Sequence, residues 1–312
     1  MRVLDLENKF KDVTDSYNIE EGHHWILINS KEVNLLKNKF NLKEEDIIEC
    51  KNYSQSAQIN FYEQYVFVIL NVLEYEDSVV NSSEFNIFLG ENYIITVYKE
   101  DLGIVTDLLM DIRESKNCFM LKEKPSPDIL LYYIMDRVIV KDYDVISQLE
   151  TKADKIEINI LKKPKHEYMH EVIHLRRQVY RIRKYITPLR YIGDSLVNND
   201  NLLIKKEYIK NYMSLNNKIE KLMMALETLV QDLSLVREAY ESEIGNEANE
   251  LMKVFTIVAA IFLPADLITS FYGMNFNNIP PMNCKNGCFY ILFLMVISSM
   301  ALIWFFKKKK WL

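Results

Sequence analysis

The chain has 312 residues, 49% of them hydrophobic and 26% charged, which is typical of a folded protein and excludes intrinsic disorder. Residues 251–312 hold six of the 38 basic and one of the 44 acidic side chains, which leaves 32 and 43, a net charge of −11, in residues 1–250. So acidic a body would repel nucleic-acid phosphates, and the seven glycines lie too far apart to build a phosphate-binding loop or a dinucleotide-binding turn. We therefore expect no nucleic acid and no nucleotide among the partners.

Residues 1–135 are predicted to form a cytoplasmic α/β domain, with a mixed sheet layer and helices. The start of the chain alternates charged with apolar residues and lacks the apolar core of a signal peptide, so we expect this domain to stay in the cytoplasm. Residue patterns predict strands at 24–29, 65–73, 84–89 and 93–98, and helices at 31–40, 102–113 and 127–141. This part carries no catalytic constellation, and we do not expect an enzyme.

Residues 136–250 are interpreted as a stalk of long helices. One helix is predicted to end near Lys162, a second covers residues 165–197, and a polar turn follows at 198–201. Apolar side chains of the third helix step by three and four as in a heptad seam, at Ile219, Leu222, Leu226, Leu229, Leu233, Val236 and Tyr240. No proline follows until Pro264, so this helix is predicted to continue into the apolar segment beyond. The seam fits either a passive stalk or a rod that couples a cytoplasmic event to a membrane gate.

Two overlapping His-Glu-x-x-His patterns lie within residues 166–174. On a helix, His166, His170 and His174 share one face, and this pattern is the zinc-protease signature, with Glu167 or Glu171 as the base. The glycine and third-ligand position of the extended signature are missing. The sequence leaves three possibilities open here: a protease site, a site that senses a transition metal, and solvated side chains on an exposed helix face.

Two segments near the end of the chain are each long enough to cross a bilayer. Residues 254–272 and 288–306 would each form about 28 Å of helix, and Asp266 is their only charged residue. Pro280 and Pro281 interrupt the polar connection between them. A buried hairpin of a soluble protein is the alternative, but two such runs favour a transmembrane hairpin. We expect a first transmembrane helix at 251–275, an outer loop at 276–287 and a second helix at 288–306.

Lysines indicate the cytoplasmic side of this hairpin. Lys307, Lys308, Lys309 and Lys310 stand in the basic tail 307–312, whereas the outer loop has only Lys285. The positive-inside rule then places both chain ends in the cytoplasm and the protein in the cell membrane. Lys253 and the four tail lysines are predicted to form a basic ring on this side. Because two helices cannot enclose a polar path, a transported solute would require several copies around it.

The segment Tyr272–Phe276, with the sequence YGMNF, stands at the outer end of the first span. In this segment, in Asn249–Val254, Thr256 and Ile261–Pro264, and in the lysine-rich ending, the chain resembles the CorA-type divalent-cation transporters, whose signature is YGMNF. The resemblance is strong over residues 245–312 and extends to the architecture of the rest. It implies a homopentameric funnel that imports hydrated Mg²⁺, with Co²⁺ as a possible second ion, without an enzymatic cofactor. It also implies Mg²⁺ as a regulatory ion, at residues that the sequence does not identify.

Gly273, Met274 and Asn275 are then the expected selectivity filter. Mg²⁺ loses its water reluctantly, so a fast and selective site should bind the hydrated ion. The side-chain oxygen of Asn275 accepts hydrogen bonds from coordinated water, and a ring of such oxygens would bind the ion without trapping it. Gly273 would let the chain turn sharply at the mouth. A helix-capping role is the alternative for Asn275.

One stripe of the first span is expected to line the pore, because its positions share helical spacing and match the pore-lining positions of the family: Asn249, Met252, Thr256, Ala259, Leu263, Asp266 and Ser270. Met252 and Leu263 are candidate hydrophobic constrictions. Asp266 departs from the family, which commonly has a neutral hydroxyl residue there. A carboxylate within a span costs about 3 kcal/mol and indicates a function. A ring of Asp266 side chains would bind cations more tightly; a hydrogen bond between helices is the alternative.

The outer loop departs from the family as well, because it lacks the acid that often follows the signature. Cys284 and Cys288 flank this loop, as unpaired thiols or as a disulfide or soft-metal pair. An inside-negative membrane potential supplies about 2.3 kcal/mol per charge per 100 mV, so influx needs no other energy source. The sequence leaves open Zn²⁺ or Ni²⁺ as the transported ion, and also a membrane-anchored protein that senses metal.

Overall fold

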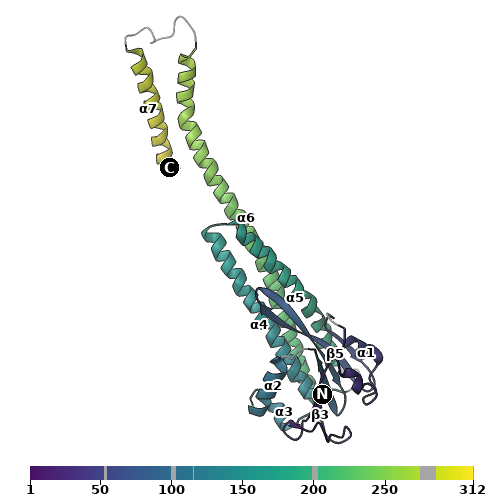
Figure 1. Ribbon diagram of the computed structural model, residues 1–312. Coiled ribbons are helices and arrows are strands. Elements are labelled where there is room, and N and C mark those ends of the chain that lie inside the picture. Colours follow the sequence, from purple (N-terminus) through teal and green to yellow (C-terminus); the bar gives the residue numbers. More distant parts are fainter. Residues whose placement is uncertain (53–54, 100–102, 115, 199–202, 275–285, 312) are drawn as a thin grey trace. The chain divides into compact units, whose positions relative to one another are not determined.

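The computed structural model describes residues 1–311 except 53–54, 100–102, 115, 199–202 and 275–285 (Figure 1). The chain divides into two compact units. The first unit comprises residues 1–159 and 165–237, and the second comprises residues 160–164 and 238–312.

A seven-stranded mixed sheet forms the centre of the first unit. In space the strands follow the order β2-β1-β3-β7-β6-β5-β4. The pair β3–β7 is parallel, and the other described pairs are antiparallel. The bounds are β1 Arg2–Asp5, β2 Lys11–Asp12, β3 His24–Asn29, β4 Gln58–Phe61, β5 Val66–Glu76, β6 Val79–Leu89 and β7 Tyr93–Tyr98.

Both faces of this sheet are covered. On one face, strand residues such as Phe67 and Phe88 pack with Val33 of the short 3₁₀ helix η1 (Val33–Leu36) and with Ile47 of α1 (Glu44–Glu49). The helix α5 (His166–Asn198) packs against β4, β5 and β6. Coverage of both faces explains why β5 is apolar almost continuously instead of alternating between apolar and polar residues.

The four predicted strands are confirmed. β3 and β7 have the predicted bounds, and β5 and β6 extend the predicted segments. The predicted helix at 31–40 is wrong, because only η1 is helical there and Asn41 then adopts a left-handed φ of 51°. A segment this short has little helical stability of its own, and tight turns suffice to bury Val33, Leu36 and Phe40. The sequence did not predict α1, β1, β2 or β4.

Long helices dominate the rest of the chain. They are α2 (Gly103–Glu114), the short α3 (Phe119–Glu123), α4 (Pro127–Lys162), α5, α6 (Ile209–Tyr272), which follows the 3₁₀ turn η2 (Lys206–Tyr208), and α7 (Gly287–Lys308). α4 is one helix where the sequence predicted two successive segments, so it continues through residues 135 and 136, where the first domain was predicted to end. α5 agrees with the helix predicted at 165–197 and contains Pro188.

The heptad seam of α6 is buried in the first unit. Its six positions from Ile219 to Val236 are at most 2% exposed, and apolar residues of α4 and α5, such as Leu149 and Ile182, are buried as well. α6 then continues without a break through Pro264 to Tyr272, as predicted. The buried seam and the apolar segment beyond it therefore belong to one helix.

The tip of the β5–β6 hairpin extends beyond the strands that flank it, and side chains of two helices pair with its free edges. On the β5 edge, the carboxylate of Asp142 in α4 accepts a hydrogen bond from the Leu73 N–H at 3.0 Å. On the β6 edge, Gln178 of α5 accepts one from the Val80 N–H at 3.0 Å, and Arg181 donates to the Val80 carbonyl at 3.1 Å. These bonds satisfy backbone groups that no strand pairs, and they attach the hairpin to both helices.

Asp142 provides a test of this arrangement. Burial raises the pKa of its carboxyl well above the usual value. The folded chain thus binds the Asp142 proton more tightly than the unfolded chain does. The stability that this proton contributes is lost as the pH rises from about 4 toward the pKa that Asp142 has in the folded chain. Asp142→Asn keeps an oxygen for the Leu73 N–H and cannot ionise, so we expect it to be at least as stable as wild type near neutral pH, with a weaker pH dependence. Asp142→Ala leaves the N–H unpaired and should cost about 1–3 kcal/mol.

The measurement is the thermal unfolding of the detergent-solubilised protein, followed by far-ultraviolet circular dichroism at several pH values between about 5 and 8. Identical unfolding curves for wild type and both variants at every pH would contradict the role assigned to Asp142.

Candidate functional site

The apolar segment of α6 and the whole of α7 lie in the second unit. α6 and α7 are each long and apolar enough to cross a membrane, and only 6% of the most apolar window of either helix is buried. Exposed apolar surface costs about 25 cal/mol per Å² in water. These helices therefore need lipid or further protein around them, and the predicted spans 254–272 and 288–306 lie within them.

The predicted pore stripe forms one exposed face of α6. Successive residues of an α-helix are rotated by about 100° around the helix axis, so all positions of the stripe fall within about 50° of one line along the helix surface. Met252 and Leu263, the predicted constrictions, are each 66% exposed. The other described members of the stripe are exposed too: Asn249, Thr256, Ala259, Asp266 and Ser270. Asn275 lies outside the described residues.

Another face of α6, about 120° from the stripe, is partly covered. Ile257 on this face is 4% exposed, and a row of half-buried residues continues it: Lys253, Ala260, Pro264 and Ile268. α7 has a matching row with helical spacing, which comprises Ile291, Met295, Ser298, Leu302 and Phe306. Because α7 is the other long helix of this unit, we infer that the two rows face each other. The stripe then points away from α7.

The exposed stripe presents hydrogen-bond acceptors. The Thr256 hydroxyl donates its hydrogen to the Met252 carbonyl at 2.8 Å, so its oxygen is free to accept from an outside donor. Within the described residues, the one side-chain hydrogen bond at Asp266 comes from Thr269 to the Asp266 backbone carbonyl, at 2.9 Å. The Asp266 carboxylate is exposed on the stripe. Such a face suits a hydrated cation, whose water molecules are donors.

Gly273 follows directly after the end of α6. Its N–H donates to the Thr269 carbonyl at 2.8 Å. A Cβ atom at this position would lie 3.1 Å from the same carbonyl oxygen, and Gly22 is the one glycine with positive φ in the described part of the chain. The structure thus gives a reason for glycine that the sequence did not, which is close approach to the helix end. Met274 is 50% exposed beside it.

The basic end of α7 closes in a Schellman motif. Lys310 has a left-handed φ of 57°, and the Trp311 N–H donates to the Phe306 carbonyl at 3.0 Å. The motif stacks the Trp311 ring on Phe306, with centroids 5.9 Å apart, while the Lys308 ammonium lies 5.2 Å from the centroid of Trp304. The sequence did not predict this motif, because lysine occupies the position where glycine is usual. The four tail lysines are exposed, and Lys253 pairs with Glu250 at 3.4 Å.

The other predicted metal candidates lie apart from this stripe in the sequence. His166, His170 and His174 are exposed on α5, and the rings of the first two stack with centroids 5.4 Å apart. The described residues contain no group of three or more His, Cys, Asp or Glu side chains that could hold a metal ion. Cys288 is a free, exposed thiol, and Cys284 lies outside the described residues. The geometry of the histidines is that of exposed side chains on a helix surface.

An α/β unit followed by long helices, of which two carry exposed apolar segments, is the architecture of a membrane protein with a large domain outside the bilayer. The sequence matches the family described as "CorA-like Mg2+ transporter protein" over residues 20–308. Because the match covers most of the chain, this protein belongs to that family.

Individual relatives match over similar lengths. The cobalt/magnesium transport protein CorA of Thermotoga maritima is 30% identical over 270 residues, which cover 86% of this chain and 75% of the relative. The putative metal ion transporter YfjQ of Bacillus subtilis is 26% identical over 280 residues, which cover 90% of this chain and 86% of the relative. The complete structure of the CorA magnesium transporter from Methanocaldococcus jannaschii has a TM-score of 0.83 at 20% identity, covering 100% of this chain and 98% of that one.

Family membership confirms the predicted fold class and argues against the protease. The shared fold extends through the α/β unit, the long helices and both apolar helices. The family consists of transport proteins and not of enzymes. The chain is accordingly a membrane protein of a transporter family.

Gly273 offers a steric test at the outer end of α6. Gly273→Ala places a methyl group 3.1 Å from the Thr269 carbonyl oxygen, so the backbone at the end of α6 has to shift by a few tenths of an ångström. We expect metal influx into proteoliposomes to fall, because this shift moves the predicted filter residues that follow α6.

The matched control is Gly245→Ala within α6, where an added Cβ meets nothing within 4 Å. This variant should transport like wild type. Equal influx for the two variants would show that the close contact at Gly273 has no functional importance.

Proposed function

We propose that this protein is a homopentameric channel through which hydrated divalent cations enter the cell passively, with Mg²⁺ as the main ion and Co²⁺ as a second one. The observation that carries the proposal is the exposed stripe on α6, which points away from α7 and ends at Gly273 and Met274. The choice of metals is supported by the relatives, which are named as cobalt/magnesium or magnesium transport proteins.

The stripe supports an assembly of several copies. A carboxylate such as Asp266 costs about 3 kcal/mol in hydrocarbon, and Thr256 and Ser270 add polar groups on the same line. α7 covers a different side of α6, so a single chain leaves these groups uncovered. Further copies would shield them from lipid and would bring the stripes together around a central path. Five copies are the number that the family resemblance implies.

Selection is assigned to the Gly273–Asn275 segment at the outer end of this path. A ring of Asn275 amide oxygens would accept hydrogen bonds from the water shell of the ion and would exert no net charge on it. Binding of this kind is weak enough for the ion to leave, which conduction requires. Asp266, about two helical turns before Gly273, would provide the fixed negative charge that the outer loop lacks.

Gating is assigned to the long helix. Met252 and Leu263 are apolar and exposed on the stripe, so rings of these side chains could close the path by excluding water. α6 also forms the buried seam of the stalk, and a change in stalk packing would therefore act on the helix that carries both constrictions. Binding of intracellular Mg²⁺ is the expected closing signal.

Orientation and driving force follow from charge. Lys307–Lys310 are exposed at the end of α7, and the positive-inside rule supports a cytoplasmic location for this end and for the N-terminus. Lys253 and these lysines would form the basic ring at that side. An inside-negative potential gives a divalent ion about 4.6 kcal/mol per 100 mV, so the channel needs no nucleotide.

The proposal is tested by ion influx into proteoliposomes under an inside-negative potential, with Mg²⁺, Co²⁺, Zn²⁺ and Ni²⁺ compared. We expect Mg²⁺ influx without nucleotide. Asn275→Ala should reduce it by about tenfold or more, because the oxygen that holds the hydrated ion is gone. Asn286→Ala is the matched control, since Asn286 precedes α7 and its side chain caps no helix N–H.

Asp266→Asn should raise the Mg²⁺ concentration for half-maximal influx by about tenfold, because the ring of negative charge is lost while the shape of the side chain is kept.

Each outcome separates the alternatives. Influx of Zn²⁺ or Ni²⁺ in preference to Mg²⁺ would favour the other metal specificity predicted within the family. Wild-type influx in Asn275→Ala would contradict the assigned filter, and an absence of influx for all four metals would indicate a membrane-anchored metal sensor instead. An unchanged half-maximal concentration in Asp266→Asn would show that this carboxylate does not contact the ion.

A further inference from the structure

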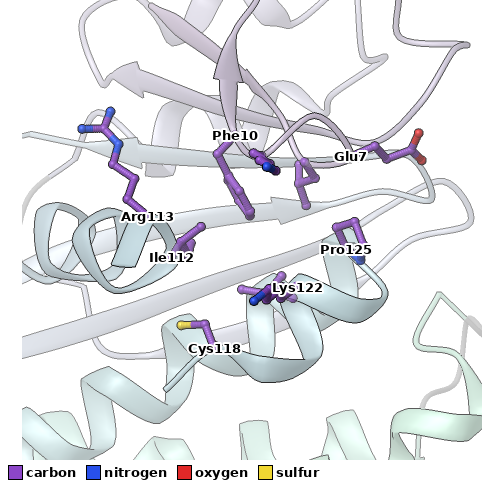
Figure 2. A pocket seen from close by; sticks show the side chains of 10 residues that line it. Glu7, Phe10, Ile112, Arg113, Cys118, Lys122 and Pro125 are labelled. Atoms are coloured by element: carbon purple, nitrogen blue, oxygen red, sulfur yellow. The ribbon is translucent and has the colours of Figure 1, made fainter. Parts of the chain in front are cut away.

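A cavity of about 620 Å³ lies in the first unit, away from the stripe of α6 in the sequence. Three segments line it: the connection between β1 and β2, the end of α2, and α3 with the following Pro125. Figure 2 shows the ring of Phe10 pointing across this space toward α3, with Arg113 and Glu7 on opposite sides of it. Its volume is in the range of cavities that hold small molecules.

The inner surface of this cavity is apolar. Leu6, Phe10, Cys118 and Leu121 line it and are all buried. The ring of Phe10 is fixed by an edge-on contact with Trp25, with centroids 6.2 Å apart. Burial raises the pKa of the Cys118 thiol, so this group is neutral and adds to the apolar surface.

The outer edge of the cavity is basic. Lys9, Arg113 and Lys122 line it and are exposed, and none of them has an ion-pair partner among the residues that the structure describes. The acid of the lining, Glu7, lies 3.2 Å from His23. These three cations, which have no ion-pair partner among the described residues, lie beside one apolar cavity although residues 1–250 carry a net charge of −11. Their combined field attracts an anion.

The backbone of the β1–β2 connection is strained where it meets the cavity. Lys9 and Phe10 both have left-handed φ angles, 55° and 57°, which is unusual for side chains of this size. The Asp5 carboxylate holds the turn by accepting the N–H groups of Glu7 at 2.9 Å and Asn8 at 3.2 Å. The turn places a positive charge and an aromatic ring at the same cavity. The two left-handed residues are the central residues of a tight turn, which the Lys11 N–H closes by donating to the Asn8 carbonyl at 3.1 Å.

We propose that this cavity binds a small organic anion that has a carboxylate or phosphate group at one end and an apolar body. The anionic group would be held by Lys9, Arg113 and Lys122, and the apolar body would lie against Phe10 and Leu121. The site lies within a single chain and is independent of the ion path proposed above.

The test uses the full-length protein in detergent and measures the binding of 1-naphthyl phosphate by equilibrium dialysis, with empty micelles as the blank. Inorganic phosphate and 1-naphthol, which carry the two halves of the probe separately, are measured in the same way. We expect saturable binding of 1-naphthyl phosphate and much weaker binding of either half. The double variant Arg113→Gln/Lys122→Gln should bind about tenfold or more weakly, because two charge-assisted hydrogen bonds are lost.

Lys116→Gln is the matched control, because Lys116 is an exposed lysine of the same region that pairs with Glu114 at 2.6 Å and does not line the cavity. It should bind the probe like wild type, and both variants should keep wild-type circular dichroism and metal influx. The proposal is overturned if the probe shows no saturable binding above the micelle blank, if the double variant binds as wild type does, if Lys116→Gln weakens binding equally, or if 1-naphthol binds as tightly as the phosphate. None of these results would affect the proposed transport function.

Discussion

A carboxylate on a membrane-spanning helix has to be kept away from hydrocarbon, and this constraint determines how the second unit can be used. α6 is apolar around most of its circumference, but Thr256, Asp266 and Ser270 follow one line along it. The half-buried rows of α6 and α7, which we infer to face each other, lie on a different side of α6 from this polar line. The polar line can be shielded only by other copies of the chain or by other protein. In the proposed channel, association and a central polar path thus have the same physical cause.

The stalk matters because one helix serves two environments. In the first unit α6 contributes a buried heptad seam, packed in the unit that also holds α4 and α5, and in the second it has an almost fully exposed apolar surface. The β5–β6 hairpin is attached to α4 through Asp142 and to α5 through Gln178. The sheet is therefore linked by hydrogen bonds to the helices that share the unit with α6. In the proposed gating, a ligand that changes the packing of this unit would act on α6, the helix that carries the stripe.

The sequence predicted the features that depend on long, regular patterns. The heptad seam, the uninterrupted helix through Pro264, the two apolar helices and four strands all extend over enough residues for periodicity to identify them. Short elements were missed or wrong, because η1, α1 and β2 are held by tertiary contacts and carry little pattern of their own. The stripe was placed by helical spacing together with the match to the family's pore-lining positions. The covered face of α6, the contact at Gly273 and the left-handed Lys310 required coordinates, since each depends on a neighbour that spacing does not reveal.

The central claim is that several copies of this chain surround the stripe of α6. Native mass spectrometry of the protein released from mild detergent measures this most directly. Five chains of 37.0 kDa give 5 × 37.0 = 185 kDa, and the account predicts this mass. A protein that remains at 37.0 kDa under conditions that preserve its fold would contradict it, because a single chain cannot shield the Asp266 carboxylate from lipid.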